Sequence, residues 1–172
     1  RMLGVVTNPV ETPADVALRG VAEELGVGHT YRPTPVGVLF GAPGTPPGTA
    51  CRQAVAATAA ILEGMRHLSD DLAVELSSTI EIAIGIHVGQ AIVGTMGYGA
   101  TTGVTAIGDA VNIASRLEAA AKELDAGLVI SEAAAKLSGL DFSGFEAREI
   151  EIRGRARALG VQVVPRGTPL PG

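Results

Sequence analysis

The chain has 172 residues, of which 47% are hydrophobic and 18% are charged, and its formal net charge is −5 at pH 7. A chain of this length and composition can bury one core and is too apolar to stay disordered, so we predict one folded domain. Because Lys and Arg do not cluster, nucleic acid and anionic membrane surfaces are disfavoured as general partners.

Two short strands and two helices are predicted in the first part of the chain. Residues 3–6 and 36–40 are apolar runs bounded by Asn, Pro or Gly, which is typical of buried strands. Residues 12–26 open with a Thr-Pro-Ala-Asp capping sequence and predict a helix. Residues 49–68 carry apolar side chains at helical spacing and predict the longest helix.

The clearest strand pattern covers residues 80–88, where branched apolar residues alternate with small or polar ones. We expect one face of this strand to be core and the other to be open, since Gly85 and Gly89 leave room for another group to approach. Residues 91–93 are expected to complete a tight antiparallel hairpin with it, and residues 94–103 to form a loop.

The second part of the chain predicts two more helices and three more strands. Asp109 is expected to cap a helix that runs to Leu124, and Ser131 to cap a short helix that ends at Leu137. Strands are predicted over 128–130, 145–153 and 159–164.

The apolar phase changes between Ala147 and Ile150, which indicates a bulge. Residues 165–172 are expected to be a flexible tail, so the domain is predicted to cover residues 1–164. Hairpins combined with helices favour an α+β sandwich, with helices packed against a mainly antiparallel sheet.

Nothing in the sequence indicates secretion or membrane insertion. No stretch reaches the roughly 18 apolar residues of a membrane helix, and residues 1–6 lack the apolar run of a signal peptide. The one cysteine, Cys51, cannot form an internal disulfide. We expect a cytoplasmic chain, and its start at Arg1 suggests a piece of a larger protein.

Several segments match the pattern of one family. They are GIHVGQAIVG at 85–94 and VTAIGDAVNIASRL at 104–117, with VLFGAP at 38–43 and EIRG at 151–154 as further matches. These segments resemble the class III adenylyl and guanylyl cyclases, and the likeness is nearly continuous from residue 36 to residue 164.

The resemblance implies a ferredoxin-like core that works as a head-to-tail dimer, either with itself or with another cyclase domain. ATP or GTP would be bound between the subunits and cyclised by attack of its 3′ hydroxyl on the α-phosphate. One subunit of such a dimer supplies two aspartates that hold Mg²⁺ or Mn²⁺. The other subunit supplies residues that read the purine, together with an Asn and an Arg that act near the transition state.

Four residues match that second set. Asn112 and Arg116 match the catalytic pair, and their i,i+4 spacing puts them on one helix face, away from the apolar stripe. Thr105 matches the purine-reading position, where a hydroxyl resembles the ATP-using members. Arg153 matches the residue that binds the triphosphate. The alternatives are an ordinary solvated polar pair, an unremarkable loop threonine and a solvated arginine.

The metal-binding positions do not match. Thr7 and Thr34 stand where the family has its two aspartates, and Thr30 stands where it has a purine-reading lysine, with only Arg32 nearby. Neutral hydroxyls cannot hold Mg²⁺ or Mn²⁺ at useful affinity. His87 has no neighbouring Cys or second His, so we expect a hydrogen-bonded sheet histidine and not a metal ligand.

The sequence therefore predicts a degenerate cyclase-like signalling domain, dimer-forming and with ATP as a candidate ligand, that is inactive as an isolated chain. No metal is expected in this chain alone, and Mg²⁺ or Mn²⁺ is expected only in an active complex. One alternative is an adenylate cyclase subunit that forms cyclic AMP and pyrophosphate from ATP beside a metal-bearing partner. The other is a purely structural interaction module.

Overall fold

The computed structural model describes all residues except 1, 9–35, 42–43, 77–78, 99–100 and 153–156, and the helix predicted over 12–26 lies outside the described part. In chain order the elements are β1 (Met2–Asn8), β2 (Val36–Phe40), α2 (Pro47–Leu76), β3 (Ile84–Gln90), β4 (Ile92–Tyr98), β5 (Thr101–Ile107), α3 (Asp109–Glu123), β6 (Ala126–Ser131), α4 (Glu132–Ser138), β7 (Glu146–Ile150) and β8 (Leu159–Pro165).

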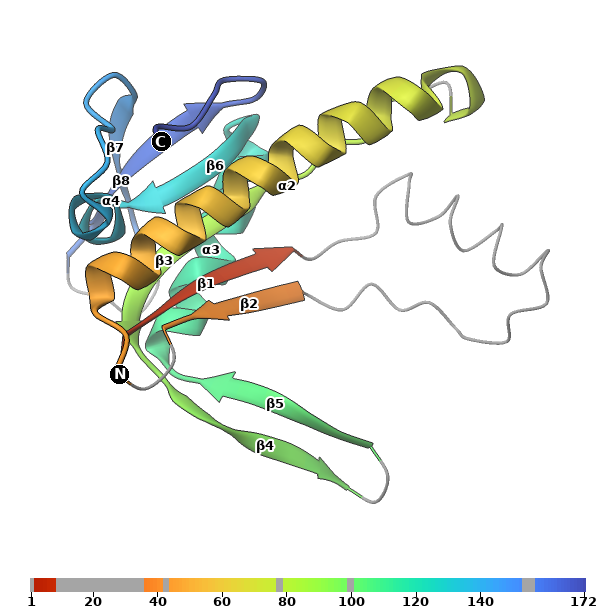
Figure 1. The fold of residues 1–172 in the computed structure, drawn as a ribbon. Coiled ribbons are helices and arrows are strands. Elements are labelled where there is room, and N and C mark those ends of the chain that lie inside the picture. The colour runs from red at the N-terminus through yellow and green to blue at the C-terminus, as the bar shows by residue number, and fades with distance from the viewer. Residues whose placement is uncertain (1, 9–35, 42–43, 77–78, 99–100, 153–156) are drawn as a thin grey trace.

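The main sheet has six strands in the order β2-β1-β3-β6-β8-β7 (Figure 1). Only the central pair, β3 and β6, is parallel, and the other four pairings are antiparallel. The predicted α+β fold with a mainly antiparallel sheet is thereby confirmed. Strands β4 and β5 form a separate two-stranded ribbon that extends away from the body of the domain.

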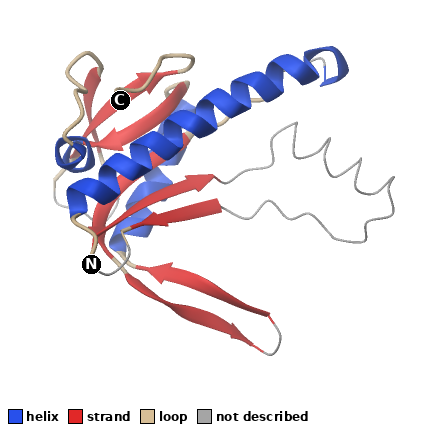
Figure 2. Ribbon diagram, viewed as in Figure 1, coloured by secondary structure: helices blue, strands red, loops and turns tan. Residues whose placement is uncertain are grey.

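Helices cover both faces of the sheet (Figure 2). On one face, Ile84, Ile86 and Val88 of β3 pack in one cluster with residues of α2 and α4. On the other face, Ile113 and Leu117 of α3 pack with Ala83 and with residues of β6 and β8. Ile84, Ile86 and Val88 thus face α2 and α4, whereas Gly85 and Gly89 of the same strand lie against α3.

The face of β3 that the sequence predicts to be open is covered by α3, so that prediction is wrong. Every residue from Ala83 to Val88 is buried, including His87, which is 6% exposed. A Cβ atom on Gly85 would lie 2.3 Å from the carbonyl oxygen of Ala114 and 2.4 Å from the backbone nitrogen of Glu118. The glycine is thus needed for the close approach of α3 to the sheet.

The predicted hairpin between β3 and residues 91–93 is also wrong. Strand β4 pairs instead with β5, with Ile92 opposite Ile107, and most of the predicted loop over 94–103 is strand. A strand has only two hydrogen-bonding edges. In β3 these edges are occupied by β1 and β6, so β4 has no edge of β3 to pair with.

Two of the predicted caps lie in the described part of the chain, and one of these is confirmed. Ser131 caps α4, and its hydroxyl accepts a hydrogen bond from the backbone nitrogen of Ala134 at 3.4 Å. The N-cap of α3 is Gly108 and not Asp109, which is the first helical residue and adds negative charge to the first turn. The predicted bulge in β7 is absent from the described pairs, since β7 and β8 keep a continuous register, and the irregularity lies in β6 near Ala126.

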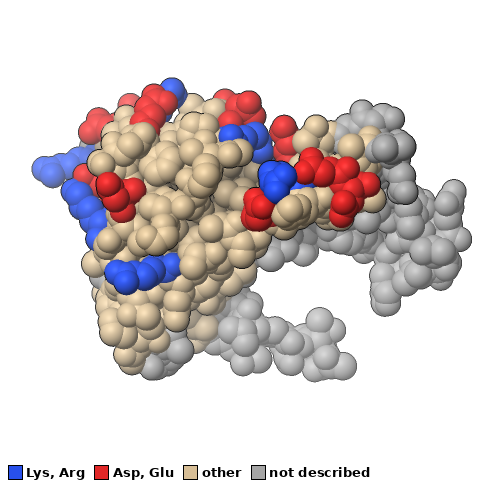
Figure 3. Space-filling model, turned by 45° about the horizontal axis from the view of Figure 1, so that its top comes forward, with Lys and Arg blue, Asp and Glu red and all other residues tan. Residues whose placement is uncertain are grey.

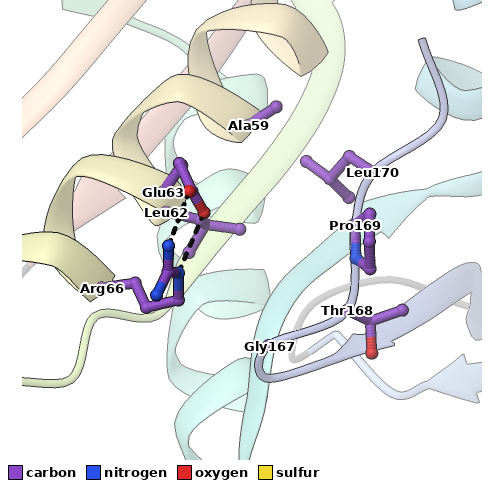
Figure 4. A pocket seen from close by; sticks show the side chains of 8 residues that line it. All are labelled: Ala59, Leu62, Glu63, Arg66, Gly167, Thr168, Pro169 and Leu170. Atoms are coloured by element: carbon purple, nitrogen blue, oxygen red, sulfur yellow. Dashed lines mark hydrogen bonds and ion pairs between the residues drawn. The ribbon is translucent and has the colours of Figure 1, made fainter.

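The segment after β8, predicted as a flexible tail, contacts the domain. Arg166 forms an ion pair with Asp125 at 2.7 Å and donates a hydrogen bond to the carbonyl oxygen of Ile82 at 2.9 Å. Leu170 packs against the core and, with Leu62 of α2, lines a hollow of about 300 Å³ (Figure 4). Both Arg166 and Leu170 thus contact the body of the domain, and the predicted domain boundary at residue 164 stays a prediction.

Charged side chains of both signs are interspersed on the face shown in Figure 3. On α2, for example, Arg66 pairs with Glu63 at 2.8 Å and with Asp70 at 3.0 Å. Within the described ranges, no helix is both long enough and apolar enough to cross a membrane.

Candidate functional site

The candidate site is built on the first turns of α3. The chain leaves β5 at Ile107, passes through Gly108 and enters the helix at Asp109. Ile113 and Leu117 are buried against the sheet, so the helix turns its opposite face outward. Asn112 and Arg116 both lie exposed on that outer face, one turn apart.

Asn112 and Arg116 line one hollow of about 350 Å³. The other lining residues are Asp109, Ile113, Ser115 and Ile152. The structure thus brings together the two residues predicted to be catalytic, while their roles stay predictions. Asn112 and Arg116 are both exposed, so their polar groups can reach a ligand.

None of the other four lining residues was singled out from the sequence as part of a site. Asp109 lies three residues before Asn112, so helical periodicity alone could have placed it on the same face. Ile152 comes from the segment after β7, and no local pattern connects it to α3. Arg153, the next residue, lies outside the described residues, and its contact with a triphosphate stays a prediction.

Thr105 lies in β5, opposite Gly94 of β4 and three residues before the cap of α3. It is therefore on the ribbon that leads into the site helix, and its predicted contact with a purine stays a prediction. Thr7 lies in β1, opposite Gly37 of β2. Thr30, Arg32 and Thr34 lie outside the described residues.

The described residues do not fit a divalent metal ion. Strands β1, β2 and β3 contain no Asp or Glu. Across the described part of the chain, no group of three or more His, Cys, Asp or Glu could hold a metal ion. Mg²⁺ and Mn²⁺ require negatively charged oxygen ligands, and hydroxyl, amide and aliphatic side chains do not replace them.

One charged residue of α3 lies on its inner side. The side chain of Glu118 is buried, and its Oε1 is 2.7 Å from the Nζ of Lys122, which is 31% exposed. Burial raises the pKa of the Glu118 carboxyl above its usual value near 4.5, although the Lys122 ammonium opposes the shift. Because the folded state then binds the proton more tightly than the unfolded state, this group stabilises the fold most below about pH 4.5.

We therefore expect the free energy of unfolding of the wild type, relative to that of Glu118→Gln, to fall as the pH rises above about 4.5. This difference in the free energy of unfolding changes by at most about 1.4 kcal/mol per pH unit, and it becomes constant above the pKa of Glu118 in the folded state. Urea unfolding between pH 4 and pH 8 measures it. Glu132→Gln is the matched control, because Glu132 pairs with Lys136 at the same spacing but is exposed. Equal pH profiles for the two variants would contradict the assignment.

Part of the chain is similar to proteins of another kind. The cholesterol oxidase of Mycobacterium tuberculosis is 60% identical over 45 residues, which are 26% of this chain and 8% of the oxidase. The cholesterol oxidase of Acinetobacter baumannii is 50% identical over 40 residues, which are 23% of this chain and 7% of the oxidase. The chain thus spans less than a tenth of either oxidase.

The whole fold is similar to that of solved cyclases. The adenylyl cyclase CyaB from Pseudomonas aeruginosa has a TM-score of 0.69 and 26% identity, with 98% of this chain and 96% of that chain covered. The guanylyl cyclase Cya2 has a TM-score of 0.72 and 20% identity, with 98% and 94% covered.

Sequence comparison gives the same family. The terminal-differentiation specific adenylate cyclase of Dictyostelium discoideum is 31% identical over 120 residues, which are 67% of this chain and 6% of that protein. Residues 36–164 match the model of the adenylate and guanylate cyclase catalytic domain, and this range contains α2, α3 and the hollow around Asn112. The chain therefore belongs to the adenylate and guanylate cyclase catalytic domain family.

Proposed function

We propose that this chain is a nucleotide-binding cyclase domain that is inactive alone and contributes the Asn112–Arg116 side of the site to a dimer with a second cyclase domain. One observation carries the proposal. Asn112 and Arg116 share a solvent-exposed hollow, whereas the neighbouring strands β1, β2 and β3 contain no carboxylate. The chain has one half of a cyclase site without the other half.

The chemistry of the two side chains suits a nucleoside triphosphate. The guanidinium of Arg116 carries a fixed positive charge and donates charge-assisted hydrogen bonds to phosphate oxygens. Such bonds strengthen as negative charge develops during transfer at phosphorus. The amide of Asn112 has both donors and an acceptor, so it can orient a ribose hydroxyl. A hydroxyl at Thr105 favours ATP over GTP as the ligand.

A second subunit is needed to enclose such a ligand. Small-molecule sites bury most of the surface of the ligand, but this hollow is lined by one face of α3 and by Ile152. The ribbon before α3 offers apolar contact area for a partner, since Ile92 and Ile107 lie opposite each other and are 76% and 55% exposed. A homodimer would repeat the same incomplete half, so only a partner with metal-binding carboxylates completes the site.

Reconstitution tests the proposal. The partner is the CyaB catalytic domain carrying substitutions that remove its own Asn and Arg counterparts, so that it retains only its metal-binding half. We expect the mixture to form cyclic AMP from ATP and Mn²⁺, while neither protein does so alone. If the mixture is inactive although the two proteins associate, and calorimetry finds no nucleotide bound, the chain is a structural interaction module instead.

A further inference from the structure

The lack of carboxylates at positions 7 and 34, which are Thr7 and Thr34, coincides with a change of sequence family along the chain. The cyclase family model begins at residue 36, so the first 35 residues lie before the match. Strand β1 lies wholly in this stretch, whereas β2 is the first strand inside the match. The cyclase-like sequence thus starts only after the region in which the metal-binding residues are missing.

The 45-residue match to the oxidases is best placed at the same end of the chain. Outside residues 36–164 the chain offers 35 residues before the cyclase match and only eight after it, 165–172. The oxidase match has 60% identity, whereas the Dictyostelium cyclase has 31% over 120 residues. Two unrelated families are not expected to match the same residues at such identity. We therefore take the oxidase match to lie at the N-terminal end, where it overlaps the cyclase match least.

We infer that residues 1 to about 45 are a segment of oxidase ancestry that stands in place of the cyclase segment bearing the metal-binding carboxylates. On this account the carboxylates were not lost by two point substitutions to Thr7 and Thr34. The whole stretch that carried them has been exchanged. The inference goes beyond the proposed function, which depends on α3 and not on this segment.

The fold explains how such a segment can occupy the sheet. Strand pairing uses backbone groups that every non-proline residue carries, so an apolar strand from another family can add to an edge of β3. Residues 2–5 of β1 pair with β3, and residues 4–8 pair with β2, in regular antiparallel register. Backbone pairing preserves the position of the strands, but only specific side chains can restore a metal site.

Measurements of metal binding can distinguish replacement of the whole segment from the loss of two aspartates by point substitution. One variant carries Thr7→Asp and Thr34→Asp, with Thr7→Ser and Thr34→Ser as the matched control. In a second variant, residues 1–45 are replaced by the aligned N-terminal segment of the CyaB catalytic domain.

Electron paramagnetic resonance measures the binding of Mn²⁺ to each protein. The measurement needs no nucleotide, so its result does not depend on the proposed function. We expect the CyaB-segment protein to bind Mn²⁺ at least tenfold more tightly than the wild type, and the Asp variant to match its Ser control.

Two outcomes would overturn the inference. If the Asp variant binds Mn²⁺ as tightly as the CyaB-segment protein, residues 1–45 are a cyclase segment that lost two side chains. If the CyaB-segment protein unfolds cooperatively yet binds no Mn²⁺, the missing carboxylates do not belong to this segment. If the CyaB-segment protein fails to fold, the inference is tested instead by the amide hydrogen exchange rates of β1 and β6 in the wild type. Amides of β1 are expected to exchange at least 100-fold faster than those of β6, and equal protection would indicate a segment fitted to this core.

Discussion

Replacing Gly85 with alanine is expected to destabilise the domain by about 3 kcal/mol or more, or to prevent its folding. The added Cβ would lie 2.3 Å from the Ala114 carbonyl oxygen and 2.4 Å from the Glu118 nitrogen, both of which belong to the backbone of α3. A flexible side chain could move aside, but the backbone of a packed helix cannot. The variant must therefore push α3 away from the sheet, and α3 carries Asn112 and Arg116.

Urea unfolding and the near-ultraviolet circular dichroism spectrum measure this effect. Gly127→Ala is the matched control, because Gly127 also lies in a buried strand, β6, but a Cβ there would meet no atom closer than 3.7 Å. We expect the control to change the free energy of unfolding by less than about 1 kcal/mol. A Gly85→Ala variant as stable as the Gly127→Ala variant would show that α3 does not pack on β3 as described.

The second large effect is expected in the reconstituted dimer. Arg116→Ala should lower kcat by about 100-fold or more while changing KM less, because the guanidinium acts most strongly on charge that develops in the transition state. Arg116→Lys should recover only part of the activity, since a lysine keeps the charge but loses the planar fork of donors.

Arg66→Ala is the control for removal of an exposed helical arginine, since Arg66 lies on α2 and pairs with Glu63 and Asp70. It should leave kcat within about twofold of the wild type, as expected for surface substitutions away from the site. Equal activity of the Arg116→Ala and wild-type dimers would remove Arg116 from the site.

Local patterns in the sequence were sufficient to predict individual strands and helix caps. The apolar run at 36–40 is β2 to the residue, and Ser131 caps the helix that follows β6. These features depend on neighbours within a few residues, namely on apolar runs, breakers and one side-chain hydrogen bond. The fold class followed from the mixture of such elements.

The pairing of strands and the packing of helices on the sheet could not be predicted from local patterns. The alternation in β3 correctly gives two faces, but it cannot tell a solvated face from one covered by a helix of small residues such as Ala110 and Ala114. The Gly85 position was interpreted as room for another group to approach an open face, and the structure shows that a helix occupies this room. Which strands meet depends on the free edges of the whole sheet, and no local pattern encodes that.

In the candidate site, too, some features follow from local sequence and others only from the tertiary structure. The i,i+4 spacing of Asn112 and Arg116 predicts a shared helix face, and the structure places both in one hollow. Ile152 reaches that hollow from a distant part of the chain, so only the tertiary structure reveals it. Thr7 and Thr34, the positions matched to the metal aspartates, both lie in the stretch that we infer to come from another family.

The central claim is that this chain carries the Asn112–Arg116 side of a cyclase site and lacks the metal-binding side. Its most direct test is the rate of cyclic AMP formation by the purified chain alone, with ATP and saturating Mn²⁺. The account predicts a rate indistinguishable from that of the Arg116→Ala variant under the same conditions. Turnover by the unmodified chain at about 1 s⁻¹, within the usual range for enzymes, would contradict it.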